Sequence, residues 1–287
     1  MTIANTENNE TKNTLGKVYL VGAGPGAVDL ITVRGAKLLA QADIIFYDAL
    51  VDPEILTLCP QAILVEVGKR CGKLSSAQQF INKRLVDAAQ KHQVIVRLKG
   101  GDPMLFGRAD EEIQTLKQAG IGIEVVPGIT AALAGAASIQ QSLTLRGVSR
   151  SVAFITLSQG TENIPHAQSM GPISNPSADT LVYYMGRKDA ARIAQQLIEQ
   201  SPNQRSDTPV HILEAVSTAR ERLWTSTLQE LATGQADQWF DSGSPALIMI
   251  GEALRSRSPE QDLQSASSEI DNGLQDSQVI THGARRA

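Results

Sequence analysis

The chain has 287 residues, of which 42% are hydrophobic and 20% charged, a size and composition typical of a globular protein of about two domains. No apolar run reaches the ~18 residues of a membrane span, and residues 1–15 are too polar for a secretory signal. Cys59 and Cys71 are the only cysteines, which excludes a disulfide framework, leaves one bridge open, and favours free thiols in the cytoplasm.

The net charge of −4 is unevenly distributed along the chain. Residues 16–160 carry a surplus of +3, whereas residues 161–287 carry −6 and the first 15 residues −1. No run of Lys and Arg occurs, and aromatic residues make up only 4%, so neither nucleic acid nor a membrane is an expected partner. A weakly basic first half would suit a small polyanionic ligand.

Strand-like and helix-like stretches alternate through the first half. The expected strands are apolar and short, at 18–21, 44–47, 62–67, 94–98 and 123–126. The expected helices show apolar residues at helical spacing, at 30–42, 78–91 and 111–119. This alternation predicts a largely parallel sheet covered by helices.

A second set of elements follows Pro127-Gly128. The pattern predicts a helix of small residues at 129–139, helices at 190–200 and 228–231, and strands at 152–157, 181–185, 210–213 and 246–250. Residues 158–179 are expected to form a long loop. The predicted organisation is a disordered tail at 1–15, α/β domains at 16–134 and 135–255, and a disordered tail at 256–287.

The stretch VRLKGGDPMLFGRADEE at residues 96–112 is the most informative in the chain. A strand ends at Lys99, and the turn Gly100-Gly101-Asp102-Pro103 uses two glycines before a proline that stops the strand. A helical pattern with acidic residues in its first turn follows from Gly107. A bare turn of this kind lets a ligand lie against the main chain at a strand end.

The segment GAGPGA at residues 22–27 allows a rival interpretation. It fits G-x-G-x-x-G/A, with Asp43 and Asp48 about where a ribose-binding acid falls, and so suggests a nicotinamide-dependent oxidoreductase. However, Pro25 removes an amide donor, and the helical pattern starts only near Asp29. We therefore rank this hypothesis second.

Other catalytic patterns are missing from the sequence. The four histidines share no ligand spacing, so no metal site is expected. Neither G-x-S-x-G nor a P-loop occurs, which argues against a serine hydrolase and against P-loop chemistry.

Seven stretches taken together resemble one family, the tetrapyrrole methylases. In chain order they are VYLVGAGPGAVDLITVRGAKLL, ADIIFYDALV, VEVGKRCGK, VRLKGGDPMLFGRADEE, VVPGITAALAGAA, LVYYMG and SPALIMIGE. The resemblance covers residues 16–254, and the extended VRLKGGDP form is most similar to the branch that methylates uroporphyrinogen III.

The resemblance implies a fold of two α/β domains, each a mainly parallel sheet flanked by helices, with the active site in the cleft between them. It also implies a homodimer and S-adenosylmethionine as methyl donor. The donor-binding residues that it implies are Pro25, Gly100, Gly101, Asp102, Leu105, Thr130, Ala131, Met185, Ala215 and Ala246. Glycines would let main-chain groups reach the adenosyl moiety, and Asp102 can accept from a ribose hydroxyl.

The implied reaction is methylation of uroporphyrinogen III, twice, to precorrin-2 for siroheme, cobalamin or heme d1. Asp48 matches the family's proton acceptor and Lys69 its proposed donor, although a turn aspartate and a surface lysine are the ordinary interpretations. Alternatives are a different precorrin methylase or a degenerate, binding-only protein. The dehydrogenase–chelatase module of some siroheme synthases is missing, so a separate protein would act downstream.

Eight substrate carboxylates would require cationic side chains in the cleft. The candidates are Arg70, Lys73, Arg97, Lys99, Arg108, Arg146, Arg150 and Arg187. The chain departs from the family where Leu74, Leu145 and Leu157-Ser158 replace histidine-containing positions, and where a glycine near Val216 is missing. The substrate side therefore looks altered and the donor side intact.

Overall fold

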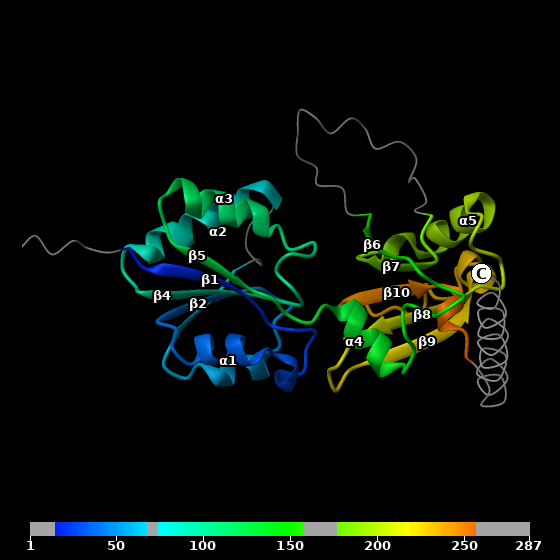
Figure 1. Ribbon diagram of the computed structural model, residues 1–287, viewed down its shortest axis with the longest axis horizontal. Coiled ribbons are helices and arrows are strands. Elements are labelled where there is room, and N and C mark those ends of the chain that lie inside the picture. The colour runs from blue at the N-terminus through cyan, green and yellow to red at the C-terminus, as the bar shows by residue number, and fades with distance from the viewer. Residues whose placement is uncertain (1–14, 68–73, 158–176, 257–287) are drawn as a thin grey trace, which may run out of the picture.

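The structure, a computed structural model, describes residues 15–67, 74–157 and 177–256. Two sheets lie side by side, each covered by helices on both faces (Figure 1). We call them the first and the second lobe. Both predicted tails, except residues 15 and 256, and most of the predicted loop at 158–179 lie outside the described residues. Within the described ranges, no helix combines the length and the apolar character that a membrane crossing requires.

The first sheet contains β1 (Lys17–Gly22), β2 (Ile44–Tyr47), β3 (Ile63–Glu66), β4 (Val94–Lys99) and β5 (Ile123–Val126). Its order is β3-β2-β4-β1-β5, and every pair is parallel. The predicted parallel sheet is confirmed. All five strands therefore end at one edge, with the end of β1 between those of β4 and β5.

Helices cover both faces of this sheet (Figure 1). They are α1 (Val33–Leu39), α2 (Leu74–Ala89) and α3 (Ala109–Gln118), with short 3-10 turns at Val28–Leu30 and Pro53–Leu58. Leu85 of α2 and Leu116 of α3 join one core, and Leu39 of α1 joins the core on the other face. The first helix begins later than predicted because the Thr32 side chain caps it, accepting from the Gly35 amide at 3.1 Å.

The second sheet contains β6 (Val152–Thr156), β7 (Thr180–Tyr184), β8 (Pro209–Glu214), β9 (Arg222–Thr227) and β10 (Ala246–Ile250), in the order β6-β7-β10-β8-β9. Only β6 and β7 pair in parallel, and the other three pairs are antiparallel. The prediction of a mainly parallel second sheet was therefore wrong. Strand β9 was not predicted, and the short connection from β8 to β9 permits only a hairpin.

Helix α4 (Ala131–Ser138) follows the first sheet in the chain but packs on the second. It lies on the face opposite α5 (Ala190–Gln200), while the short α6 (Leu228–Ala232) packs beside α5 (Figure 1). The small residues of α4 permit its close packing on the second sheet, since a Cβ on Gly135 would lie 3.4 Å from the Leu247 side chain. The predicted boundary at residue 134 stays a prediction, and this packing favours a second domain that begins at α4.

Candidate active site

Three glycine-containing turns meet where β1, β4 and β5 end. Gly24 and Gly101 exchange main-chain hydrogen bonds of 3.2 and 2.7 Å. A Cβ on Gly22 would lie 2.7 Å from the Gly101 oxygen and 2.6 Å from the Gly128 Cα. Only glycine fits this junction, because any side chain would force the turns apart.

Asp102 joins two of these turns through its carboxylate. One oxygen accepts from the Met104 amide at 2.7 Å and the other from the Gly128 amide at 2.9 Å. Each carboxylate oxygen can accept a further hydrogen bond. The predicted contact with a ribose hydroxyl stays a prediction, and the structure adds a role in holding the turns together.

Gly101 faces the open side of this junction. Its φ is +68°, and the nearest atom to a Cβ built there would be the Thr130 Cα at 3.9 Å. The neighbouring Gly100 instead packs on the loop after β2, where a Cβ would lie 2.7 Å from the Leu50 side chain. The main chain at Gly101 is therefore accessible in a way that a larger residue would block.

Tyr184 of β7 contacts this edge from the second lobe. Its hydroxyl lies 2.6 Å from the Thr130 hydroxyl oxygen and accepts from the Ala132 amide at 3.1 Å. The Phe106 ring, from the turn after β4, packs edge-on at 5.2 Å between ring centroids. Burial raises the pKa of Tyr184 above its ordinary value, so its hydroxyl stays protonated near neutrality.

The GAGPGA turn contacts the second lobe as well. A Cβ on Gly26 would lie 2.9 Å from the Val216 oxygen, and the Ala27 amide donates to the Ser217 hydroxyl at 3.1 Å. Helix α1 starts only at Val33, after the 3-10 turn. The amide groups that would hold a pyrophosphate at Gly24 and Ala27 already have protein partners, which disfavours the dinucleotide hypothesis.

Three non-glycine residues that follow β7 and β8 in the second lobe have positive φ. Met185, Ala215 and Ser217 have φ values of 56°, 49° and 63°. Met185 is 55% exposed, whereas Ala215 is buried. Ala246 lies opposite Glu214 in the β10–β8 pair, next to Ala215. Such strained residues concentrate at functional sites, so this part of the second lobe is consistent with the predicted donor-binding roles of Met185 and Ala215.

The remaining predicted donor-site residues occupy the same region. Pro25 follows Gly24, which pairs with Gly101 through the main chain. Leu105 lies half-buried in the turn after β4, where its amide donates to the main-chain oxygen of Asp102 at 3.3 Å. Ala131 begins α4 directly after Thr130. Most of the predicted donor residues thus gather at one edge of the first sheet and the facing part of the second lobe.

Asp48 lies at the end of β2, on the same edge. One of its oxygens accepts from the Leu50 amide at 3.1 Å, and the other lies 3.7 Å from Nη2 of Arg97. Its side chain is 25% exposed, so it is both anchored and accessible. Lys69, its predicted catalytic partner, lies outside the described residues.

The predicted substrate-binding cations divide into four groups. Arg97 and Lys99 are 3% and 4% exposed and bind Glu112 of α3, so their assignment to substrate carboxylates was wrong. Arg187 donates to main-chain carbonyls at Asp241 and Ser242.

Three other candidates lie at or near the surface. Arg108 pairs with the Glu111 carboxylate at 2.6 Å, and Arg146 and Arg150 lie in the exposed turn before β6. Arg70 and Lys73 lie outside the described residues.

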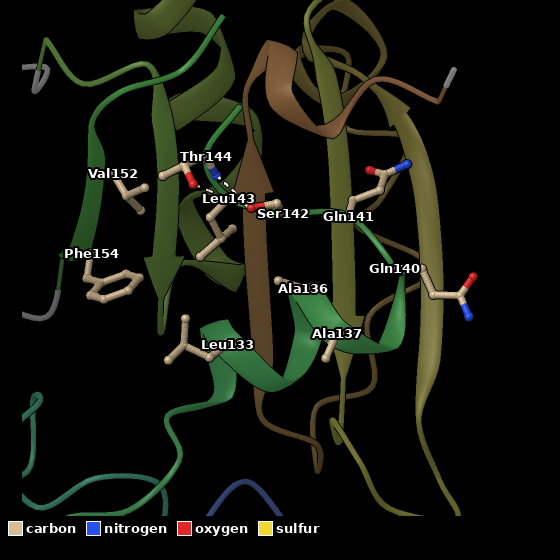
Figure 2. Close-up of a pocket in the computed structure, with 10 residues that line it drawn as sticks. All are labelled: Leu133, Ala136, Ala137, Gln140, Gln141, Ser142, Leu143, Thr144, Val152 and Phe154. Atoms are coloured by element: carbon tan, nitrogen blue, oxygen red, sulfur yellow. Dashed lines mark hydrogen bonds between the residues drawn. The ribbon is translucent and has the colours of Figure 1, made fainter. Parts of the chain in front are cut away.

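A pocket of about 470 Å³ opens between α4 and β6 (Figure 2). Leu133 and Phe154 point into it from these two elements, and the Phe154 ring lies 6.1 Å from that of Tyr184. The sequence did not indicate this pocket, because α4 and β6 are brought together only by the tertiary structure. Leu145, one of the positions that depart from the family, directly follows the lining residue Thr144, and its main chain is hydrogen-bonded to that of Ser149. Leu157 is partly buried in the second lobe, and Ser158 lies outside the described residues.

The fold and these turns define a two-lobed α/β protein that offers main-chain groups to a small molecule at the ends of parallel strands. Residues 17–232 match the tetrapyrrole (corrin/porphyrin) methylases. The chain belongs to this family, whose members are methyltransferases.

Curated relatives are longer than this chain. Siroheme synthase of Pseudomonas fluorescens strain SBW25 is 41% identical over 258 residues, which cover 89% of this chain and 54% of the relative. Siroheme synthase 2 of Aeromonas hydrophila is 44% identical over 254 residues, covering 86% and 52%. The chain thus spans about half the length of the curated relatives it matches.

Solved structures match over nearly their whole length. Uroporphyrin-III C-methyltransferase of Thermus thermophilus, complexed with S-adenosylhomocysteine, is 36% identical with a TM-score of 0.68, covering 84% of this chain and 99% of that one. Cobalt precorrin-4 methyltransferase is 27% identical with a TM-score of 0.69, covering 84% and 96%. These matches confirm the family resemblance and the two-domain α/β fold.

Proposed function

We propose that this protein uses S-adenosylmethionine to methylate uroporphyrinogen III twice, giving precorrin-2. The carrying observation is the junction of Gly24, Gly101 and Gly128, which leaves the Gly101 main chain open toward Thr130. The similarity to a uroporphyrin-III C-methyltransferase that is complexed with S-adenosylhomocysteine supports the same proposal.

The residues present fit an adenosyl cosubstrate. A Cβ at Gly101 would fill open space rather than protein, so a ligand can approach its main chain there. Asp102 retains acceptor capacity for hydroxyls, and the exposed Met185 offers a polarizable apolar contact. Pro25, Leu105, Ala131, Ala215 and Ala246 would complete the walls.

When bound, the sulfonium supplies an electrophilic methyl group. The protein's main task is then to hold the donor and an electron-rich pyrrole carbon in line, which can remove a large part of the barrier. Asp48 accepts the proton that leaves the macrocycle, and Lys69 serves as proton donor. Arg108, Arg146 and Arg150, with Arg70 and Lys73, are the proposed partners of the substrate carboxylates.

The proposed setting is a cytoplasmic homodimer in siroheme, cobalamin or heme d1 synthesis. We propose that a dehydrogenase and a chelatase act on its product.

The test is anaerobic incubation with uroporphyrinogen III and methyl-labelled donor. We expect two labelled methyl groups per macrocycle and the precorrin-2 chromophore. A protein that binds S-adenosylhomocysteine but methylates only an already methylated macrocycle would favour the alternative of a different precorrin methylase, to which the 27% identity with cobalt precorrin-4 methyltransferase points. Donor binding without turnover on either substrate would indicate a degenerate enzyme.

A further inference from the structure

Three charged side chains are buried together beneath Asp48. Arg97 and Lys99 of β4 are 3% and 4% exposed, and Glu112 of α3 is fully buried. Nε of Arg97 lies 3.1 Å from Oε1 of Glu112, and Nζ of Lys99 lies 3.2 Å from both Glu112 oxygens. Gln78 of α2 also donates to Glu112, at 3.1 Å. We call Arg97, Lys99 and Glu112 the buried charge cluster.

A cluster of this kind is costly for stability alone. Removing ions from water costs several kcal/mol per ion, and well-packed apolar residues at such positions are often at least as stable. The pKa of Lys99 is lowered below its ordinary value, first by burial and then by the charge of Arg97, while Glu112 and Asp48 oppose that shift. The charges of Arg97, Glu112 and Asp48 therefore interact with that of Lys99.

The charges balance only when Asp48 is counted. The cluster holds two cations and one carboxylate, and the Asp48 carboxylate, 3.7 Å from Arg97, is the fourth charge. Arg97 is fixed by further bonds to the Leu98 oxygen at 3.0 Å and the Phe46 oxygen at 3.4 Å. Its guanidinium consequently has a defined position from which to hold Asp48.

We propose that Arg97 and Lys99, held by Glu112, are positioning residues that hold the Asp48 carboxylate in place as the proton acceptor of the methyl-transfer reaction. This inference rests on the proposed function. When a C–H bond of the macrocycle breaks, its electron pair stays in the ring and the proton bonds to an Asp48 oxygen. The four side chains then carry one uncompensated positive charge in a poorly solvated site, which favours rapid release of the proton to water.

Other charged groups lie on the elements next to the end of β2. Arg84 of α2 lies over the Phe46 ring at 5.8 Å, and Glu66 of β3 is the register partner of Tyr47. The electrostatic contribution of these groups is the same in every variant below. The changes between variants therefore report the cluster.

The test changes the charge of the cluster while leaving Asp48 in place. In Lys99→Gln one cation of the cluster is lost, so the acid limb of the kcat profile should move to higher pH. Lys99→Arg preserves the charge and should leave the limb in place. The double variant Lys99→Gln with Glu112→Gln is neutral again and should return the limb to its original pH.

A second readout does not need the substrate. The ¹³C carboxylate signal of Asp48 in the full-length protein, assigned by comparison with Asp48→Asn, should show the same upward shift of its titration midpoint in Lys99→Gln and the same reversal in the double variant. If kcat falls equally at every pH and the carboxylate titration does not move, the cluster is only structural and the inference is wrong. If the titration moves but the wild-type protein makes no methylated product, the proposed function is wrong and the coupling to Asp48 stands.

Discussion

In the first lobe the turns after β1, β4 and β5 meet through glycine, and Gly24 and Gly101 have positive φ, as do Phe106 and Arg108 farther along the chain after β4. In the second lobe Met185, Ala215 and Ser217, which follow β7 and β8, have positive φ. Glycine adopts such backbone angles without steric cost and exposes main-chain groups. The other residues are strained by about 1–3 kcal/mol each and need packing or hydrogen bonds to hold them. The glycine junction of the first lobe can therefore meet a ligand through its main chain, whereas the turns of the second lobe present side chains.

The largest expected effect comes from Gly101→Val in the first lobe. A side chain there would extend into open space beside Thr130, so we expect S-adenosylhomocysteine binding to be lost, with strain of about 1–3 kcal/mol. Calorimetric titration would measure the affinity, and urea unfolding the stability.

Gly120→Val is the matched control for this substitution. Gly120 has the same φ of +68°, and no atom lies within 4 Å of a Cβ built there. It should lose similar stability and keep its affinity. Normal binding by Gly101→Val, or equal loss in both variants, would contradict the proposed main-chain contact.

Asp48→Asn should lower kcat by about 100-fold or more while leaving donor affinity unchanged, because a general base contributes about 10²–10⁴-fold. Asp52→Asn is the control, since Asp52 makes the same kind of turn bond, accepting from the Glu54 amide at 3.0 Å where Asp48 accepts from Leu50 at 3.1 Å. Both kcat and affinity would be measured by steady-state methylation and by titration. An unchanged kcat in Asp48→Asn would remove Asp48 from the mechanism.

Tyr184→Phe addresses the hydrogen bonds that hold the start of α4 against β7. Without the hydroxyl, the Ala132 amide and Thr130 lose a partner, and we expect donor affinity to fall by about five-fold, the equivalent of one hydrogen bond of about 1 kcal/mol. Tyr183→Phe is the control, because the Tyr183 ring packs on the other face of β7 with α5. Equal effects of the two substitutions would show that the Tyr184 hydroxyl does not shape the donor site.

The smallest effect is expected at Ser217. Ser217→Ala keeps the residue at a φ of 63° but removes the hydroxyl that accepts from Ala27, which should cost about 1 kcal/mol. Ser217→Gly also loses the hydrogen bond but relieves the strain, so it should be about 1 kcal/mol more stable than Ser217→Ala. Urea unfolding of the two variants gives the difference, and equal stabilities would mean that this backbone is not strained.

The sequence indicated the features that depend on local pattern. Alternating apolar strands and amphipathic helices predicted the first sheet, and the glycine turns at 22–26 and 100–101 marked the strand ends, because main-chain conformation there depends on the residues themselves. The likeness of these stretches to a known family then assigned Asp48 and the donor-site residues. Donor binding and catalysis by these residues remain predictions.

What only the tertiary structure decided were pairings between residues far apart in the chain. Strand β10 runs antiparallel to both β7 and β8, and with the hairpin of β8 and β9 it makes the second sheet mainly antiparallel. Arg97 and Lys99, which the sequence suggested as partners of substrate carboxylates, are instead buried against Glu112 of α3. Charge alone does not show whether a lysine meets water or a carboxylate, since that depends on which helix packs over its strand.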